Sequence, residues 1–448
     1  MQENGLSTSL SKENIKKLLL KYSLPSIIAM MASSLYNITD SIFIGHGVGA
    51  LAISGLALTF PLMNLSAAFG SMVGLGAATL MSVRLGQKDY DTANNILGNV
   101  FTLDIIVSIA YMIVVLSFLD PILYFFGASE NTLPYARDYM KIILYGNVVT
   151  HMYFGFNDIL RSSGKPKLAM ATIIFSIFIN LILNPIFIFK FKWGIQGSAI
   201  ATVTSQTIMM IWQFKILSNK KDLIHFKRGI FKLRKDIITN TFAIGLSPFL
   251  MNALACIIII SINQNLFKYG GDLAVGAYGI VNRMSFLFMM IVMGLDQGMQ
   301  PITGYNYGAG FYDRVSSALR YTIILATIVM TSGMIITEIF PEAIASAFTT
   351  DKELIQLAKT GLWISFLCFP IVGFQMVTSY FFQSIGIAGK AIFLTLSRQL
   401  FFLLPLLYFL PTLWGISGVW FSLPISDFMS SILSAIILSK QLKKFKNC

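Results

Sequence analysis

Residues 193–197 read WGIQG, and residues 414–418 read WGISG, 221 positions further along a chain of 448 residues. Similarity that returns at one fixed offset indicates an internally duplicated architecture. Other loop motifs repeat at nearly the same offset, which is stronger evidence than a likeness between two apolar segments. The pairs are 49–55 with 271–277, Gly86 with Gly308, Tyr90-Asp91 with Tyr312-Asp313, and Gly164 with Gly386, each 222 apart.

The composition indicates a membrane protein. Hydrophobic residues make up 55% of the chain and charged residues only 12%, with a mean hydropathy of +0.72. Soluble domains carry about 25% charged residues, so this chain in a soluble fold would expose large apolar patches to water. We therefore expect an all-α protein that crosses the membrane many times.

About twelve apolar segments reach the ~20 residues that a bilayer span needs. We expect these spans at 22–44, 51–83, 93–119, 136–160, 167–189, 197–217, 240–267, 275–303, 315–340, 357–384, 389–410 and 416–439.

Each copy of the repeat holds six of these spans, so both copies enter the membrane from the same side. This predicts two six-helix bundles related by a pseudo-two-fold axis along the membrane normal. In transporters built this way, substrate binds between the halves and one half rocks on the other. The predicted boundaries are an N-terminal lobe at 1–217, a basic cytoplasmic linker at 218–236 and a C-terminal lobe at 237–448.

The distribution of positive charge predicts the topology. If alternate connections are cytoplasmic, starting with the N-terminus, 25 of the 33 Lys and Arg side chains lie on that side. The positive-inside rule then places both termini in the cytoplasm. The net charge of +13 is explained by topology, and nucleic acid is not an expected partner.

One acid interrupts the first span, in residues 34–47, SLYNITDSIFIGHG. An ionisable group inside a membrane helix costs about 2.5–3.5 kcal/mol on insertion scales and is by default a functional hypothesis. Asn37 shares the helix face of Asp40, and two further spans offer polar pairs one turn apart. These pairs are Asn180 with Asn184, and Ser198 with Thr202.

These residues predict a cation site with one carboxylate and several neutral oxygen atoms. A hard cation such as Na⁺ prefers oxygen ligands, whereas a proton needs only the carboxylate. Both interpretations assign the ion to Asp40.

The chain resembles the MATE (multidrug and toxic compound extrusion) family over essentially its whole length. The motifs that carry the resemblance are YNITDSIFIGHG, RLGQKDYDTAN, FNDILRSSGKPK, INLILNPIF, WGIQGSAIAT, GLDQGMQPITGYNYGAG and WGISGVWFSLPISD. The closest likeness is to the prokaryotic branch with its key acid on helix 1.

The resemblance implies an N-terminal cation site formed by Asp40, Asn180, Asn184 and Thr202, where Na⁺ is one candidate ion. The position of Asn184 is often an aspartate in that branch. With asparagine the site has one acid, so it balances one Na⁺ or one H⁺ rather than both.

The repeat also tests whether the second half carries the same acid. Asp40 aligns with Ile262 or Asn263, and Asn180 and Asn184 align with apolar and aromatic residues near Phe401. We therefore expect ion coupling in the first half and an apolar wall for substrate in the second. The expected substrate cavity includes Tyr36, Tyr139, Asn157 and Asn263, of which Asn157 is implied by the resemblance.

Other charges lie within the predicted spans. Arg283 is expected to pair with Asp296, with Asp427 or with a backbone carbonyl, so these acids have either a structural or a transport role. Asp104 and Asp158 lie near helix ends and are expected to be solvated or paired with Arg161.

The expected function is a secondary antiporter in the bacterial cell (inner) membrane, a monomer that exports cationic or amphipathic small molecules. No cofactor is expected, and the coupling ion is H⁺ or Na⁺. The alternative is a flippase for lipid-linked oligosaccharides or phospholipids of the same superfamily, although only Arg283 lies clearly within a span to bind a phosphate. An enzyme is not expected, because the sequence has no paired His ligands, phosphate loop or nucleophile motif.

Overall fold

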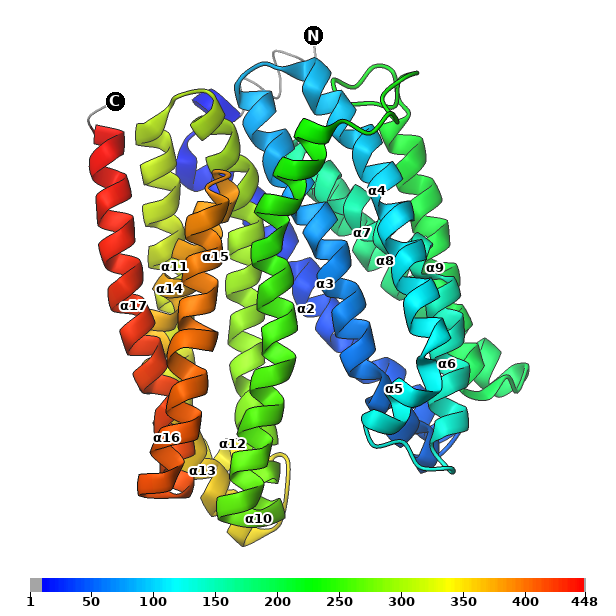
Figure 1. The fold of residues 1–448 in the computed structure, drawn as a ribbon, viewed down its shortest axis with the longest axis vertical. Helices are drawn as coiled ribbons and strands as arrows, with labels where there is room; N and C mark the ends of the chain where they lie inside the picture. Colours follow the sequence, from blue (N-terminus) through cyan, green and yellow to red (C-terminus); the bar gives the residue numbers. More distant parts are fainter. Residues whose placement is uncertain (1–9, 447–448) are drawn as a thin grey trace. The chain divides into compact units, whose positions relative to one another are not determined.

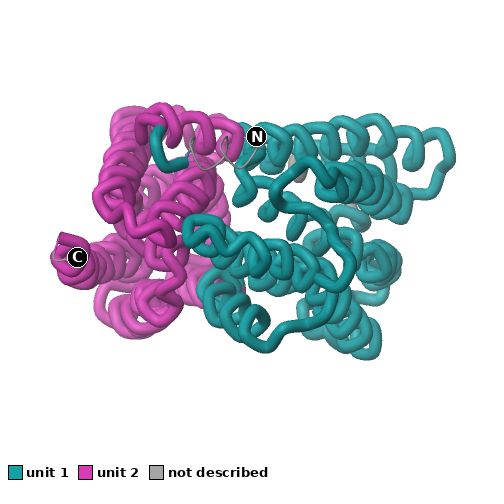
Figure 2. The backbone as a smooth tube through the Cα atoms, turned by 90° about the horizontal axis from the view of Figure 1, so that it is seen from above, with its two compact units in different colours: residues 1–12, 28–252 teal, residues 13–27, 253–448 magenta. Residues whose placement is uncertain are grey.

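The computed structural model describes residues 10–446, apart from the side chains of residues 37, 38 and 50. All regular structure in this range is helical (Figure 1). The chain divides into two compact units, coloured separately in Figure 2. Unit 1 comprises residues 1–12 and 28–252, and unit 2 comprises residues 13–27 and 253–448.

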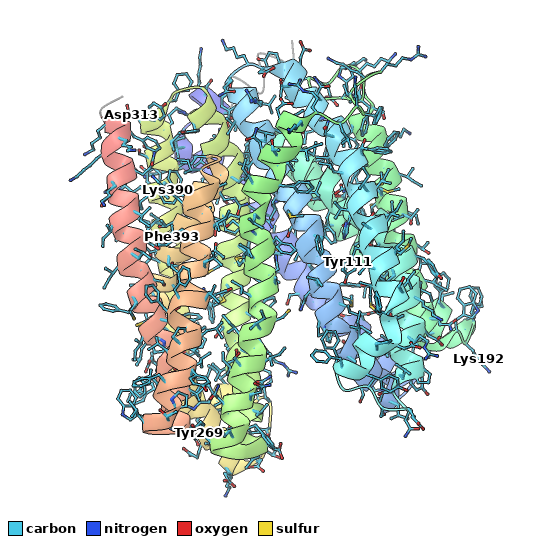
Figure 3. The ribbon with its side chains drawn as sticks, in the orientation of Figure 1. Tyr111, Lys192, Tyr269, Asp313, Lys390 and Phe393 are labelled. Atoms are coloured by element: carbon cyan, nitrogen blue, oxygen red, sulfur yellow. The ribbon has the colours of Figure 1, made fainter. Side chains whose placement is uncertain are left out.

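The helices of unit 1 follow one another with short connections. They are most of α2 (Ile15–Gly47), α3 (Ala50–Gly86), α4 (Tyr90–Ser117), α5 (Leu119–Phe125), α6 (Leu133–Tyr145), α7 (Asn147–Ser162), α8 (Pro166–Pro185) with the π-helical turn η1 (Ile186–Lys190), α9 (Gly194–Leu217) and the first part of α10 (Lys235–Gly308). Apolar side chains of α3, α4, α5 and α6 form one of its cores. Tyr111 of α4, labelled in Figure 3, donates from its hydroxyl to the Leu62 carbonyl at 2.6 Å beside that core.

Besides residues 13–27, unit 2 contains the rest of α10 and the helices that follow it. Its helices are α11 (Tyr312–Ile339), α12 (Pro341–Ser346), α13 (Lys352–Phe366), α14 (Phe369–Ser384), α15 (Ala388–Leu396) with the π-helical turn η2 (Ser397–Leu403), α16 (Leu404–Trp414) and α17 (Ile416–Lys446). Lys390 of α15 donates to Gln441 of α17 at 2.5 Å and lies 5.1 Å from the ring centre of Phe382 (Figure 3).

The predicted twelve-span, all-α fold is confirmed. Within residues 10–446, eight helices are long and apolar enough to cross a bilayer, and α13 with α14, bent by 54°, forms a ninth span. α10 counts once among these, although Gly271, at φ 68° and ψ −165°, divides it into two spans. α9 and the continuous pair α6–α7 complete the twelve, and they are less apolar because they carry buried polar side chains such as Gln213 and Asn157.

The two halves repeat the same turn conformations. Glycine is favoured wherever φ is positive, because a side chain would crowd the following carbonyl. Positive φ recurs at equivalent positions, which supports the duplication at the level of the backbone. The pairs are Gly49 (115°) with Gly271 (68°), Lys88 (61°) with Gly310 (77°), Gly164 (87°) with Gly386 (76°), and Gly194 (56°) with Gly415 (57°).

Lys88 is the exception among these turns, because it holds a left-handed backbone without being glycine. Its side chain is exposed, so truncation removes little packing. We expect Lys88→Gly to raise the unfolding midpoint in detergent, since the strain it relieves is about 1 kcal/mol. Gly310→Lys, at the equivalent turn, should lower the midpoint. A lower midpoint for Lys88→Gly would contradict this account of the turn.

The unit boundaries fall inside α2 and α10, not at the segment 218–236 predicted to link the lobes. In unit 2, residues 15–27 of α2 pack against the second part of α10, where the Ser23 hydroxyl donates to the Leu295 carbonyl at 3.3 Å. A side chain at Gly298 would collide with the Ser23 backbone. In unit 1, the start of α10 packs against α3 in the same manner, with Gly76 facing the Thr241 carbonyl. Glycines thus permit two close helix contacts that hydropathy does not reveal.

The segment 218–234 packs against α4. Asn99 donates to the carbonyls of Ile230 and Lys232 at 3.4 and 3.2 Å and accepts from the amide of Arg234 at 2.9 Å. Five rings from this segment, α4, α7 and α9 cluster beside it: Phe101, Phe156, Phe214, Phe226 and Phe231.

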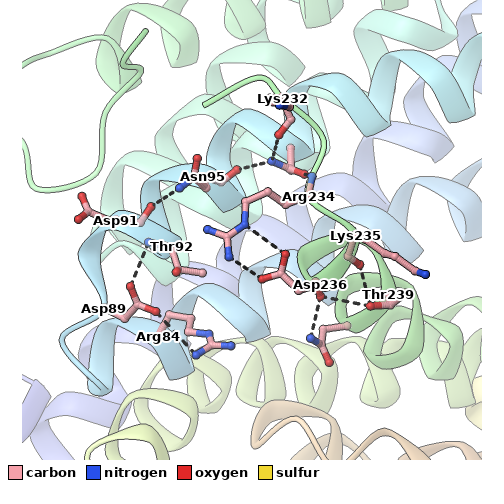
Figure 4. Close-up of polar contacts among 12 residues, drawn as sticks. Arg84, Asp89, Asp91, Thr92, Asn95, Lys232, Arg234, Lys235, Asp236 and Thr239 are labelled. Carbon is pink, nitrogen blue, oxygen red and sulfur yellow. Dashed lines mark hydrogen bonds and ion pairs between the residues drawn. The ribbon is translucent and has the colours of Figure 1, made fainter. Parts of the chain in front are cut away.

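Polar contacts continue to the start of α10. Arg234 forms two hydrogen bonds with the Asp236 carboxylate, at 2.7 and 3.1 Å (Figure 4), and these bonds raise the pKa of Arg234 above its ordinary value. At the neighbouring end of α4, the Asp89 carboxylate caps the helix by accepting from the amide of Thr92 at 3.1 Å. The predicted linker is therefore an ordered part of unit 1.

Candidate functional site

Asp40 lies on α2 inside unit 1, and its side chain is only 6% exposed. Its Oδ1 atom accepts two hydrogen bonds, from Asn184 Nδ2 at 2.5 Å and from the Ser198 hydroxyl at 2.6 Å. Hydrogen bonds to an ionised acceptor are the strong ones. The two donors therefore offset part of the cost of burying the carboxylate.

Two helices supply the partners because their polar residues recur at one-turn spacing. On α8, Asn184 Nδ2 also lies 3.4 Å from Asn180 Oδ1, and Asn180 Nδ2 donates to the Thr202 hydroxyl of α9 at 3.2 Å. The Tyr36 hydroxyl, one turn before Asp40, completes the group at 2.7 Å from the Thr202 hydroxyl. Asp40, Asn180, Asn184, Ser198 and Thr202 thus meet at one place.

α8 changes its geometry directly after Asn184. Pro185 has no backbone N–H to donate, and the next five residues, Ile186–Lys190, form the π-helical turn η1. Such turns occur frequently at functional sites. Here the wider turn begins at Ile186, two residues after Asn184.

The oxygen atoms around Asp40 fit a small cation. Asn184 Oδ1 is buried and has no hydrogen-bond partner in the described part of the chain, which is the condition that a bound cation would relieve. The Asp40 carboxylate and the hydroxyls of Ser198 and Thr202 supply further oxygen atoms, the donor type that Na⁺ prefers. Within residues 10–446 no three His, Cys, Asp or Glu side chains come together, so a metal here would depend on neutral ligands.

Two tyrosines border the site. Tyr36 reaches the site through its hydroxyl, 2.7 Å from that of Thr202, and Tyr139 lies near Asp40. Tyr139 is 2% exposed and packs in an apolar cluster with Ile44, Leu56 and Ala199. This cluster excludes water from one side of the carboxylate.

Two other predicted residues, Asn157 and Asn263, lie elsewhere. The side chain of Asn37 is outside the described residues. Asn157 on α7 is 2% exposed and donates to the Ala169 carbonyl at 2.7 Å and the Thr172 hydroxyl at 2.9 Å, so it lies within the bundle. Asn263 is partly buried and belongs to unit 2.

The predicted pairing of Arg283 with Asp296 or Asp427 is wrong. Asp427 of α17 accepts from Arg398 Nε of η2 at 2.8 Å, and the side chain of Arg283 is exposed. Asp296 is fully buried, and neither of its carboxylate oxygens has a partner among the described residues. Arg398 reaches Asp427 because η2 packs directly against α17.

Sequence reasoning missed a row of polar residues on α8. Thr172 and Ser176 precede Asn180 and Asn184 at steps of four, and all four side chains are buried. Residues four apart share one helix face, so this spacing could have predicted that the four polar side chains form one row. The prediction that Asp104 is solvated or paired with Arg161 was also wrong, because Asp104 is fully buried and its carboxylate oxygens have no partner in the described part of the chain. Asp158 does pair with Arg161, at 3.4 Å.

Twelve membrane spans in two units, and a buried carboxylate among neutral oxygens in one of them, define a multi-pass membrane transporter rather than an enzyme. Within that class, the MatE family model matches residues 25–186 and 244–409, which is most of the chain. The chain belongs to the MatE family. The two matched stretches correspond to the two halves of the repeat.

Several characterised proteins are similar over nearly the whole chain. Multidrug export protein MepA of Staphylococcus haemolyticus (strain JCSC1435) is 28% identical over 427 residues, 95% of this chain and 94% of its own. The protein of that name in Staphylococcus aureus (strain MSSA476) is 26% identical over the same shares.

Solved structures share the fold. An outward-facing multidrug resistance MATE family transporter of the MOP superfamily superimposes with a TM-score of 0.92 over 99% of both chains, at 23% identity. A MATE structure in the bent conformation gives 0.93 over 98% of both chains, also at 23% identity.

Proposed function

We propose that this protein is a secondary antiporter that exports organic cations, drugs or amphipathic compounds in exchange for H⁺ or Na⁺. The observation that carries the proposal is the Asp40 carboxylate, buried in unit 1 among neutral oxygen atoms and bonded by Asn184 and Ser198. An intramembrane carboxylate that no Lys or Arg neutralises is costly to retain, and reversible binding of a cation gives it a purpose.

The relatives support the transported class. The similar staphylococcal proteins are named multidrug export proteins, and the similarity covers 95% of this chain. By analogy, the substrates are structurally varied small molecules. Alternating access by rocking of the two halves is the mechanism proposed for this duplicated plan.

The Asp40 site balances one positive charge at a time. It contains a single carboxylate, and Asn184 contributes a neutral amide. A Na⁺ ion would use the unpartnered Asn184 Oδ1 and the nearby hydroxyls as ligands, whereas a proton would reside on Asp40 alone. In either case, the ion and the substrate occupy the protein alternately.

The proposal includes an orientation and an assembly state. We propose that the protein spans the bacterial cell membrane with both termini in the cytoplasm, because an excess of Lys and Arg on one side favours this orientation. We propose a monomer as the working unit, surrounded by the lipid bilayer.

The test is transport by purified protein in proteoliposomes loaded with ethidium. A Na⁺ gradient and a pH gradient are imposed separately, with the membrane potential clamped by K⁺ and valinomycin. We expect one of the two gradients to drive ethidium movement and thereby to name the coupling ion. Ethidium movement that ignores both gradients, or lipid flipping in its place, would overturn the antiport proposal and favour the flippase alternative.

A further inference from the structure

A second acid, besides Asp40, is buried in unit 1. Asp104 lies on α4, its side chain is 0% exposed, and both of its carboxylate oxygens lack a hydrogen bond among the described residues. It points at α7, where a side chain at Gly155 would collide with Asp104 Oδ2. The glycine therefore makes room for the carboxylate without supplying a donor.

A third acid stands close by on α7. Asp158 Oδ1 lies 3.4 Å from Arg161 Nη1, and the Asp158 carboxyl group lies near that of Asp104. Asp158 Oδ2 in turn faces Gly74 of α3. Two carboxylates and one guanidinium thus share the junction of α3, α4 and α7.

Within residues 10–446, Arg161 is the one cation that forms an ion pair with an acid of this junction. α3 has no titratable side chain between residues 66 and 83, and on α4 Tyr111 is the titratable residue nearest in sequence to Asp104. On α7, the remaining titratable side chains that face the bundle are His151, bonded to the Ser66 hydroxyl at 3.1 Å, and Tyr153, whose hydroxyl donates to the Thr172 carbonyl at 3.4 Å.

In the other elements that pack on α4, charged side chains form their contacts away from Asp104. Arg137 of α6 forms an ion pair with Asp120, and Asp138 accepts from Gln196. In the segment 218–234, Asp222 pairs with Lys165 at 2.5 Å, and His225 bonds the Asp222 carbonyl.

The balance of charge requires a proton at this junction. Arg161 neutralises one acid, and it is Asp158 that it contacts. Two adjacent carboxylates in a low-dielectric site do not both ionise, and an isolated buried charge is among the costliest features of a fold. Asp104 is the acid left over.

A row of buried polar groups leads from this junction toward Asp40. Arg161 Nη2 donates to Asn157 Oδ1 at 2.9 Å, and Asn157 donates to the Thr172 hydroxyl of α8 at 2.9 Å. The Gln213 amide of α9 also donates to the Thr172 hydroxyl, at 3.0 Å.

The row continues along α8. The Tyr153 hydroxyl of α7 donates to the Thr172 carbonyl at 3.4 Å, and the buried Ser176 lies one turn further along α8. Asn180 and Asn184 follow at the next two turns. From Thr172 to Asn184 the helix rises about 18 Å, so the row runs through much of a bilayer's thickness.

We propose that Asp104, with Asp158 and Arg161, forms a second proton-binding site of unit 1, and that the polar row on α8 connects it to the Asp40 site. This rests on the proposed function of Asp40 as the ion-coupling residue. The junction lies toward the end of α7 that precedes the turn at 163–165, the end that the distribution of Lys and Arg assigns to the cytoplasm. Asp104 is then the acid that exchanges protons between the row and that side of the membrane.

The first test is the infrared spectrum of the purified protein, which separates protonated from ionised carboxyl groups. At a pH where exposed acids are ionised, Asp104→Asn should remove one protonated-carboxyl band that shifts in D₂O. The matched control is Asp313→Asn, an exposed aspartate labelled in Figure 3, which should remove only ionised carboxylate bands. If Asp104→Asn also removes only ionised bands, Asp104 carries no proton and the proposal fails.

This readout is independent of transport. Loss of the band in Asp104→Asn supports the second site even if Asp40→Asn transports normally, a result that would overturn the proposed function alone. Conversely, loss of transport in Asp40→Asn with no protonated band at Asp104 overturns only the second site.

The second test interrupts the polar row. Thr172→Val keeps the shape of the side chain but removes the hydroxyl that accepts from Asn157 and Gln213. Under the gradient that drives the wild type, we expect transport to fall about tenfold, the effect of roughly 1.4 kcal/mol. Substrate binding should not change, and Thr172→Ser should restore transport.

The matched control is Thr322→Val in unit 2, a fully buried threonine whose hydroxyl bonds the carbonyl of Ala318 one turn back in its own helix. It should transport as the wild type does. Wild-type transport by Thr172→Val would overturn the connection between the two sites. A loss in Thr172→Val that Thr172→Ser does not restore would overturn it as well, because it would trace the effect to packing.

Discussion

Asp40→Asn is expected to reduce gradient-driven transport to the level of empty liposomes while the protein still folds. Asparagine has the shape of aspartate, and its Oδ1 can accept from Asn184 and Ser198 as the carboxylate does. What it lacks is the charge that attracts a cation and the ability to take up a proton. The measurement is ethidium transport under each gradient, with the unfolding midpoint as the check on folding.

Two further variants make the Asp40 result specific. Asp313→Asn makes the same chemical change at an exposed aspartate and should transport normally. Ser198→Ala removes one of the two donors to Asp40, so we expect an intermediate loss of about tenfold, since hydrogen bonds to charged groups contribute about 1.5–3 kcal/mol. Normal transport by Asp40→Asn would assign coupling to another acid, with Asp104 and Asp296 as the next candidates.

Asp427→Leu is expected to destabilise unit 2 by about 3 kcal/mol, because it leaves Arg398 without its partner. The side chains of Asp427 and Arg398 are 8% and 21% exposed, so the cost should lie at the lower end of the range for buried pairs. The measurement is the unfolding midpoint in detergent, together with the yield of folded protein.

The double variant Asp427→Leu, Arg398→Met distinguishes a structural role of the ion pair from a role in transport. Replacing both partners of a buried pair by apolar residues is often neutral or stabilising, so we expect the midpoint to recover. If transport recovers with it, the pair has a structural role. Restored stability without transport would mean that Asp427 takes part in transport itself.

Much of the fold could be predicted from the sequence, because a bilayer span leaves a long apolar segment and a duplication leaves matching loops. The loop motif at 271–277 was correctly paired with 49–55, yet a connection between the spans 240–267 and 275–303 was expected there. In the structure, α10 continues through this region and changes direction at Gly271 alone. The unit boundaries inside α2 and α10 were also hidden, since contacts such as Ser23 with Leu295 depend on which helices are neighbours.

The candidate site was predictable where the signal is local. Asn180 with Asn184, and Ser198 with Thr202, stand out because polar pairs at one-turn spacing are conspicuous in apolar helices. Thr172 and Ser176 lie on the same face but were not predicted as site residues, because hydroxyl side chains in helices commonly bond their own backbone. The partner of Asp427 could not be predicted, because it is fixed by the packing of η2 on α17 and not by spacing along the chain.

The shared left-handed turns have an evolutionary consequence. Four pairs of turns keep their backbone conformation across the two halves, although the acid at position 40 has no acidic counterpart at 262 or 263. After the ancestral duplication, the turns between helices therefore kept their backbone conformation, while the side chains on the helix faces diverged. One copy could then specialise in binding a small ion while the other adapted to a bulky substrate. A point substitution on a helix face of either copy could change what the protein transports without changing its fold.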